Sequence, residues 1–235
     1  MRRPLGHLLK GAYLQPHKSA ENDYFNLENC LKNLSLDSKP WITRGALKWL
    51  DEHLNEEMVG IEYGAGGSTP WLCRRLKVLY TYESNPKWAA STLLTMSQDI
   101  EMMRKWRLHF VNCNWNLDST GRRWYIKGGH ADTTSEETMI EMENDFLLNP
   151  SREINFAFID GSIRYRSFVN AMELLREKPG SIICVDNSEK PHRRIYLDQL
   201  IPKHWKEYSF ENKANTDDFD QSLEVGGVTS IFVVG

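Results

Sequence analysis

The fold of this chain is decided by the stretch Val59-Gly60-Ile61-Glu62-Tyr63-Gly64-Ala65-Gly66-Gly67-Ser68-Thr69. An apolar strand pattern runs into a glycine-rich turn, and a helix pattern starts near Thr69-Pro70, where a proline is accepted in the first helical turn. Glycines let the backbone turn sharply and approach a ligand without an intervening Cβ. The amino terminus of a helix offers free N–H groups to a carboxylate or a phosphate. The stretch therefore predicts a ligand-binding turn between a strand and a helix.

Strand and helix patterns alternate on both sides of this turn. We expect strands over 58–63, 78–83, 108–113, 154–160 and 181–186. We expect helices over 42–54, 70–76, 86–105, about 135–148 and 164–177. Apolar strands that alternate with helices predict a parallel sheet covered on both faces.

The chain closes with a different pattern. Two further strands are expected over 206–211 and 229–234, joined by a polar loop without a helical period, which predicts an antiparallel pair. The expected fold is thus α/β: a doubly wound, mostly parallel seven-stranded sheet with a terminal antiparallel hairpin. This is the methyltransferase variant of the Rossmann-like fold rather than the dehydrogenase one. Residues 41–235 form this domain, and residues 1–40 form an amino-terminal extension that packs on it or covers its ligand.

Composition excludes some classes of protein. The 235 residues carry 29 basic and 32 acidic side chains, a net charge of −3, so a dedicated nucleic-acid binder is not expected. The four cysteines are scattered without a CxxC motif, which suits free thiols in a reducing compartment. No apolar run suits a signal peptide or a membrane span. We therefore expect a cytoplasmic protein with no membrane partner.

Two carboxylates indicate the ligand. Glu83 ends the second expected strand, 21 residues after Glu62, the spacing at which an acid reaches the ribose hydroxyls of an adenosine ligand. Glu62 precedes the first glycine by two residues, where a carboxylate would repel a pyrophosphate but accept hydrogen bonds, directly or through water, from the ammonium of a methionine moiety. Thr69 stands where the dinucleotide fingerprint has its third glycine. The turn therefore favours S-adenosylmethionine over NAD.

The chain resembles a family of bacterial class I S-adenosylmethionine-dependent methyltransferases in its glycine-rich turn and its second expected strand. It resembles the same family in Pro40-Trp41-Ile42-Thr43 and in residues 158–164 and 179–189. The resemblance runs from about residue 40 to the carboxyl terminus and implies the cofactor and the reaction class but no acceptor. In the region after the third strand, where related enzymes often have an acid that contacts adenine, this chain has Asn112 and Asn114. We expect cofactor contacts from Glu62, Tyr63, Gly64, Ala65, Gly66, Ser68, Thr69, Glu83, Ser84, Asn114 and Asp160.

The acceptor side of the site is expected at the ends of two later strands. Asp160 ends the fourth strand and Asp186-Asn187 the fifth, so these side chains should line one cleft beside the cofactor, although a strand-terminal Asp is often only a turn former or helix cap. Catechol-type O-methyltransferases resemble this pattern and hold Mg²⁺ with the three side chains, so metal use stays open. His130 and His192 lie in expected loops and are candidate bases, or ordinary exposed histidines.

Three functions are compatible with the sequence. The first is S-adenosylmethionine-dependent methyl transfer to a hydroxyl of a small molecule or sugar, with Asp160, Asp186, Asn187 and His130 as candidate catalytic residues. The second is an RNA or protein methyltransferase, which would need a basic or peptide-binding groove. The third is a non-catalytic S-adenosylmethionine-binding protein.

Overall fold

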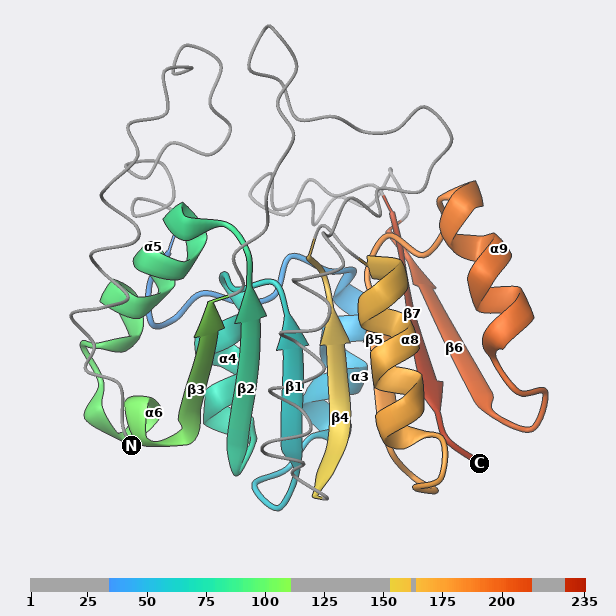
Figure 1. Cartoon of the computed structure of the whole chain (residues 1–235), viewed down its shortest axis with the longest axis horizontal. Coiled ribbons are helices and arrows are strands. Elements are labelled where there is room, and N and C mark those ends of the chain that lie inside the picture. Colours follow the sequence, from blue (N-terminus) through green and yellow to red (C-terminus); the bar gives the residue numbers. More distant parts are fainter. Residues whose placement is uncertain (1–33, 111–152, 162–163, 213–226) are drawn as a thin grey trace, which may run out of the picture.

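Seven strands form one sheet in the computed structural model, which describes residues 34–110, 153–161, 164–212 and 227–235 (Figure 1). The strands are β1 (Val59–Tyr63), β2 (Val78–Glu83), β3 (Trp106–Phe110), β4 (Ile154–Ile159), β5 (Ile182–Val185), β6 (Lys206–Glu211) and β7 (Val228–Val233). Their order is β3-β2-β1-β4-β5-β7-β6. Strands β1 to β5 are parallel to one another, whereas β7 is antiparallel to both β5 and β6. The mostly parallel sheet with its terminal antiparallel hairpin confirms the predicted fold.

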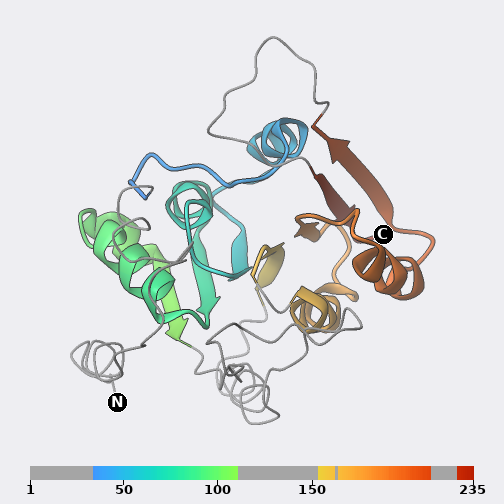
Figure 2. The same cartoon turned by 90° about the horizontal axis from the view of Figure 1, so that it is seen from above.

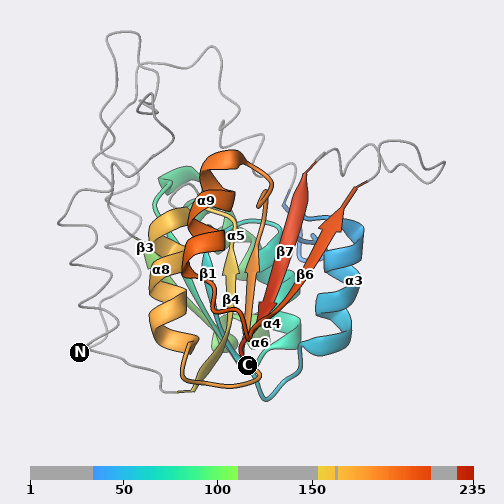
Figure 3. The ribbon, with the colours of Figure 1, turned by 90° about the vertical axis from the view of Figure 1, so that its right-hand side faces the viewer.

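Helices cover both faces of the sheet (Figures 2 and 3). They are α3 (Arg44–His53), α4 (Ser68–Arg75), α5 (Pro86–Met96), α6 (Ile100–Lys105), α8 (Arg164–Leu175) and α9 (Pro191–Leu200). On one face, α3 and α4 pack on a core that includes Leu50, Leu72, Phe156 and Phe158. On the other face, α8 and α9 pack on a core that includes Phe168, Leu175, Leu197 and Phe232. The sheet thus lies between two apolar cores, and polar groups stand at the ends of its strands.

Three sequence-based expectations are corrected. The single helix over 86–105 is two helices, because the Asp99 side chain accepts the N–H groups of Glu101 (2.9 Å) and Met102 (3.1 Å) and thereby caps a new helix, α6. Helix α9 was not expected, and His192 therefore lies in its first turn rather than in a loop. Strand β3 starts at Trp106 rather than Leu108; residues 111–113 and the helix expected over 135–148 lie outside the described residues.

The residues ahead of the sheet contact helix α4 and strand β7. Asp37, in the segment predicted to be an extension, pairs with Arg74 of α4 (3.1 Å). Thr43 directly precedes α3, but its side chain makes no capping bond; instead, its backbone N–H donates to Thr229 Oγ1 of β7 (3.2 Å). This ties the start of α3 to the terminal hairpin. In the described ranges, every helix is too short or too polar to cross a membrane.

Candidate functional site

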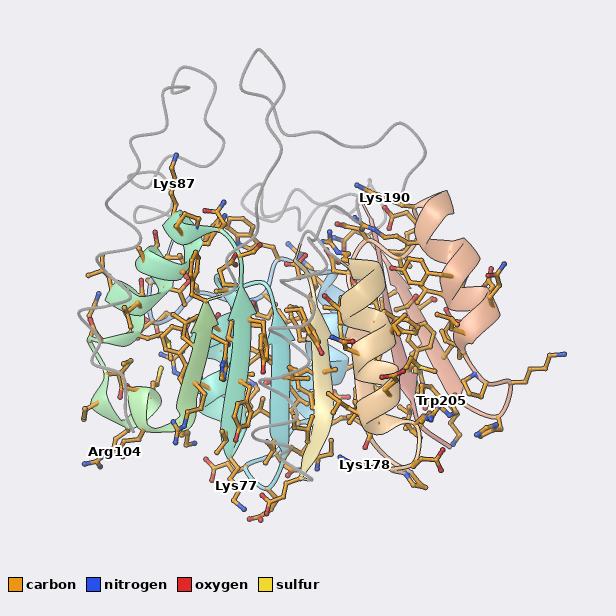
Figure 4. All side chains as sticks on the ribbon, in the orientation of Figure 1. Lys77, Lys87, Arg104, Lys178, Lys190 and Trp205 are labelled. Atoms are coloured by element: carbon orange, nitrogen blue, oxygen red, sulfur yellow. The ribbon has the colours of Figure 1, made fainter. Side chains whose placement is uncertain are left out.

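The glycine-rich turn lies at the carboxyl edge of the sheet. Strands β1, β2, β4 and β5 all end at this edge, which is uppermost in Figure 1. In Figure 4, Lys87 and Lys190 mark the same edge, and Lys77 and Lys178 mark the opposite one. The strand order reverses between β1 and β4. In open α/β sheets, ligands bind outside the carboxyl ends of the strands at such a switch point, so the turn stands where a ligand is expected.

Backbone contacts fix the turn against the next strand. Gly64 has a φ of +102° and donates its N–H to the carbonyl of Tyr82 (2.8 Å). The Tyr63 carbonyl accepts the N–H groups of Asp160 (3.1 Å) and Gly161 (2.6 Å). A Cβ on Gly64 would lie 2.8 Å from the Cα and the N of Gly161. The ends of β1 and β4 therefore approach so closely that only glycine fits.

Gly64→Ala should lower the free energy of unfolding by about 2–3 kcal/mol, because a positive φ strains a side-chain-bearing residue and the new methyl group collides with backbone. Gly180→Ala is the matched control, since Gly180 also has a positive φ (+83°) but nothing lies within 4 Å of its Cβ position. Urea denaturation of both variants separates backbone strain from collision. Equal destabilisation of the two would mean that the contact with Gly161 is unimportant.

Glu83 connects the turn to the end of β2. The Ala65 N–H donates to Glu83 Oε2 (2.7 Å) and the Asn85 N–H donates to Oε1 (2.5 Å). Ser84 lies between them, and Asn85 caps α5 by accepting from the Lys87 N–H (2.9 Å). The buried carboxylate therefore stands directly beside the glycine turn, at the place that the sequence spacing predicts.

Gly66 and Gly67 differ in the space around them. A Cβ on Gly67 would lie 2.9 Å from the Lys39 carbonyl, whereas a Cβ on Gly66 would meet only Trp88, at 3.9 Å. Trp88 packs edge to face with Trp41, whose ring centroid lies 6.1 Å away, and Trp41 is 44% exposed. The turn is thus packed against the chain at Gly67 but has room at Gly66, next to two indole rings.

Glu62 lies beneath the turn rather than at its surface. Its carboxylate has no exposed area and accepts hydrogen bonds from three hydroxyl groups, those of Ser68 (2.5 Å), Thr69 (2.8 Å) and Thr81 (2.8 Å). Burial raises the pKa of Glu62 to about 7, and the three hydroxyl groups oppose that rise. Glu62 therefore anchors the first turn of α4 to β1 and β2. A contact between Glu62 and a methionine ammonium stays a prediction. It would be indirect, through the hydroxyl groups that bond to the buried carboxylate.

Tyr63 points to the opposite face of the sheet, as strand alternation requires. Its ring stacks on Tyr82, with centroids 6.0 Å apart, and its hydroxyl is buried without a hydrogen-bond partner among the described residues. The contribution of Tyr63 to the turn is therefore made by its backbone carbonyl.

The three polar side chains at the ends of β4 and β5 converge on one guanidinium. Arg164 Nη2 donates to Asp160 Oδ1 (2.5 Å) and to Asn187 Oδ1 (3.1 Å), and lies 3.9 Å from Asp186 Oδ2. The Arg164 side chain is 13% exposed, and Asp160 is the more accessible carboxylate, at 31% against 5% for Asp186. The structure thus brings Asp160, Asp186 and Asn187 together as predicted, around a residue whose role the sequence did not indicate.

Further contacts hold Asp186 in place. The Thr229 hydroxyl donates to Asp186 Oδ1 (2.8 Å). Arg193 Nη1 donates to the carbonyls of Asp186 (3.3 Å) and Asn187 (2.9 Å). Burial, followed by the neighbouring charge of Asp160, raises the pKa of Asp186 to about 6. Burial also raises the pKa of Asp160, against the opposing effect of Arg164. Two carboxylates and two guanidiniums therefore share this end of the site.

The oxygen set does not fit a divalent cation as it stands, because a guanidinium nitrogen lies between the three side chains. In the described ranges, no three His, Cys, Asp or Glu side chains are grouped so that they could hold a metal ion. The remaining candidates, Asn114 and His130, lie outside the described residues. Sequence reasoning missed Arg164, Arg193 and Thr229. The available signal was that Arg164 follows Asp160 by four residues.

Solved structures share this fold. The chain matches an O-methyltransferase from Bacillus cereus, crystallised with S-adenosylhomocysteine, at 18% identity and a TM-score of 0.54, covering 93% of this chain and 94% of that one. It matches the O-methyltransferase TomG from Streptomyces achromogenes, crystallised with S-adenosylmethionine, at 16% identity and a TM-score of 0.54, covering 97% and 96%.

An rRNA methylase from Streptococcus thermophilus is similar at 12% identity and a TM-score of 0.52, covering 80% of this chain and 92% of that one. The chain matches no protein-family model, and no curated protein sequence is significantly similar to it. At these identities the likeness establishes the Rossmann-like methyltransferase fold.

Proposed function

We propose that this chain, which has the methyltransferase fold, transfers a methyl group from S-adenosylmethionine to a hydroxyl of a small molecule. The observation that carries the proposal is the pairing of the glycine turn with Glu83 at the switch point of the sheet. This pairing places the Glu83 carboxylate, which can accept hydrogen bonds from ribose hydroxyls, beside the backbone of the glycine turn, which a ligand can approach closely. The O-methyltransferases from Bacillus cereus and Streptomyces achromogenes, crystallised with the cofactor or its product, support the same reading.

In the proposed complex, Glu83 accepts hydrogen bonds from the ribose hydroxyls and Gly66 lets the backbone approach the ligand. Glu62 is a positioning residue, since it holds Ser68 and Thr69 and thereby fixes the amino terminus of α4. At that terminus the Thr69 N–H already donates to the Gly66 carbonyl (3.2 Å) and Pro70 has no N–H. The positive end of the helix dipole, rather than a row of free N–H groups, would therefore favour the carboxylate of the methionine moiety.

The chemistry requires one proton transfer and one methyl transfer. Asp160, as a carboxylate, takes the proton of the acceptor hydroxyl, and the oxygen attacks the methyl carbon as the bond from that carbon to the sulfonium breaks. The products are a methyl ether and S-adenosylhomocysteine. The raised pKa of Asp160 brings it closer to neutral pH, where a general base is most effective.

A small acceptor is favoured over a nucleic acid because acidic side chains outnumber basic ones by 32 to 29. The exposed Trp41, which packs on Trp88 next to the glycine turn, offers an aromatic surface to an apolar ring or sugar.

Calorimetry tests the proposal. S-adenosylhomocysteine should bind the full chain, and NAD should bind more weakly or not at all. Gly66→Ala should weaken S-adenosylhomocysteine binding by about tenfold or more, about 1.4 kcal/mol, because a methyl group enters the ligand's approach. Its unfolding midpoint should match wild type, because the nearest atom to the new Cβ is 3.9 Å away. Tighter binding of NAD than of S-adenosylhomocysteine would overturn the proposal.

A further inference from the structure

We infer that the Arg164 guanidinium is the resident cation of the acceptor site and takes the place of a divalent metal between Asp160, Asp186 and Asn187. The placement of Arg164 is independent of the proposed function; only its catalytic consequence, a methyl transfer that needs no added metal, rests on that proposal.

The first argument is position. A single nitrogen, Nη2, is the common neighbour of one oxygen from each of the three side chains, at 2.5, 3.1 and 3.9 Å. These are distances of hydrogen bonds and an ion pair, whereas Mg²⁺ requires oxygens at about 2.0–2.1 Å in octahedral geometry. A metal at the centre of this oxygen set would have to displace the guanidinium.

The second argument is that the oxygens of Asp186 and Asn187 already have partners. Asp186 Oδ1 accepts the Thr229 hydroxyl (2.8 Å). The backbone carbonyls of Asp186 and Asn187 accept from Arg193 (3.3 and 2.9 Å). Asp186 Oδ2, the oxygen that would complete a cation site, faces Arg164. The cluster therefore offers an incoming metal few free lone pairs.

The third argument is charge. The two carboxylates of Asp160 and Asp186 are balanced by the guanidiniums of Arg164 and Arg193, and an arginine stays protonated throughout the physiological range. The largely buried Arg164 thus supplies a permanent positive charge, and a second cation would meet repulsion in a place of low dielectric. Arg164 is in this view a positioning residue: it orients the Asp160 carboxylate toward the acceptor.

Mn²⁺ binding, followed by electron paramagnetic resonance, tests the inference without cofactor or acceptor. Wild type should bind no Mn²⁺ up to about 1 mM, a free energy near −4 kcal/mol. Arg164→Ala should expose the oxygen set and bind one Mn²⁺ at least about tenfold more tightly than wild type. Arg104→Ala is the control, because Arg104 pairs with one exposed carboxylate, that of Glu101 on α6, away from these oxygens, and it should behave as wild type.

Two results would overturn the inference. One is stoichiometric Mn²⁺ binding by wild type that Asp160→Asn abolishes. The other is a folded Arg164→Ala, verified by circular dichroism, that binds no more Mn²⁺ than wild type. If Arg164→Ala does not fold, the Mn²⁺ titrations of wild type and of Asp160→Asn still test the inference. Calorimetry with S-adenosylhomocysteine on the same samples reports on the proposed function separately, so the two can fail independently.

Discussion

Asp160→Asn is expected to slow methyl transfer by about a hundredfold or more while leaving the affinity for S-adenosylhomocysteine within about threefold of wild type. Asparagine keeps the size of the side chain and an oxygen for Arg164, but it cannot take the acceptor proton. In wild type the rate should rise with pH through the raised pKa of Asp160, because only the carboxylate is a base. Single-turnover rates across pH, measured with the true acceptor, check both statements.

The matched control is Asp198→Asn, which alters an Arg–Asp pair of the same i,i+4 spacing on the exposed side of α9. This variant should keep the wild-type rate. Normal turnover of Asp160→Asn would remove Asp160 from the chemistry. A large loss of S-adenosylhomocysteine affinity in Asp160→Asn would instead make it a cofactor contact, the other role that the sequence suggested for it.

The protein should lose about 3 kcal/mol of stability as the pH rises from about 4.5 to about 7, through Glu62 alone. The fold raises the pKa of this carboxyl from 4.5 to about 7. Between these values the folded state keeps a proton that the unfolded state releases, so rising pH favours unfolding. Below this range the effect vanishes, and above it the loss is complete. Urea denaturation at several pH values measures the change.

Two substitutions identify Glu62 as the source. Glu62→Gln should flatten the pH dependence, because the amide does not titrate, whereas Glu52→Gln at an exposed site of α3 should leave it as in wild type. Glu62→Ala, measured at about pH 6, should cost about 3 kcal/mol, because three buried hydroxyl groups lose their acceptor. An unchanged pH profile in Glu62→Gln would show that the hydroxyl groups fully compensate for burial.

Periodicity was sufficient to predict the parallel part of the sheet, because its strands are short, mostly apolar runs between helical patterns. It could not divide α5 from α6, since that break depends on one capping side chain, Asp99, within an otherwise continuous helical pattern. Helix α9 was missed although Pro191 stands at its first position, a start signal that was not used.

The residues of the site differ in how well their positions could be predicted from the sequence. Glu83 could be placed because its spacing from the glycine turn follows from β1 pairing with β2. The partners of Glu62 could not, because hydroxyl groups of α4 and β2 meet it only once the helix packs on the sheet. The convergence of Asp160, Asp186 and Asn187 was predicted from strand ends, but the residue between them depends on the direction in which α8 leaves the sheet.

The position of β7 has a consequence for the order in which the molecule assembles. This last strand lies between β5 and β6, and its Thr229 holds Asp186. Strand β6 therefore has no neighbour to pair with until β7 is in place, while β1, β2 and α4 can pack beforehand. Because long-range pairings form slowly, we expect Asp186 to gain its contact with Thr229 later in folding than β1 pairs with β2.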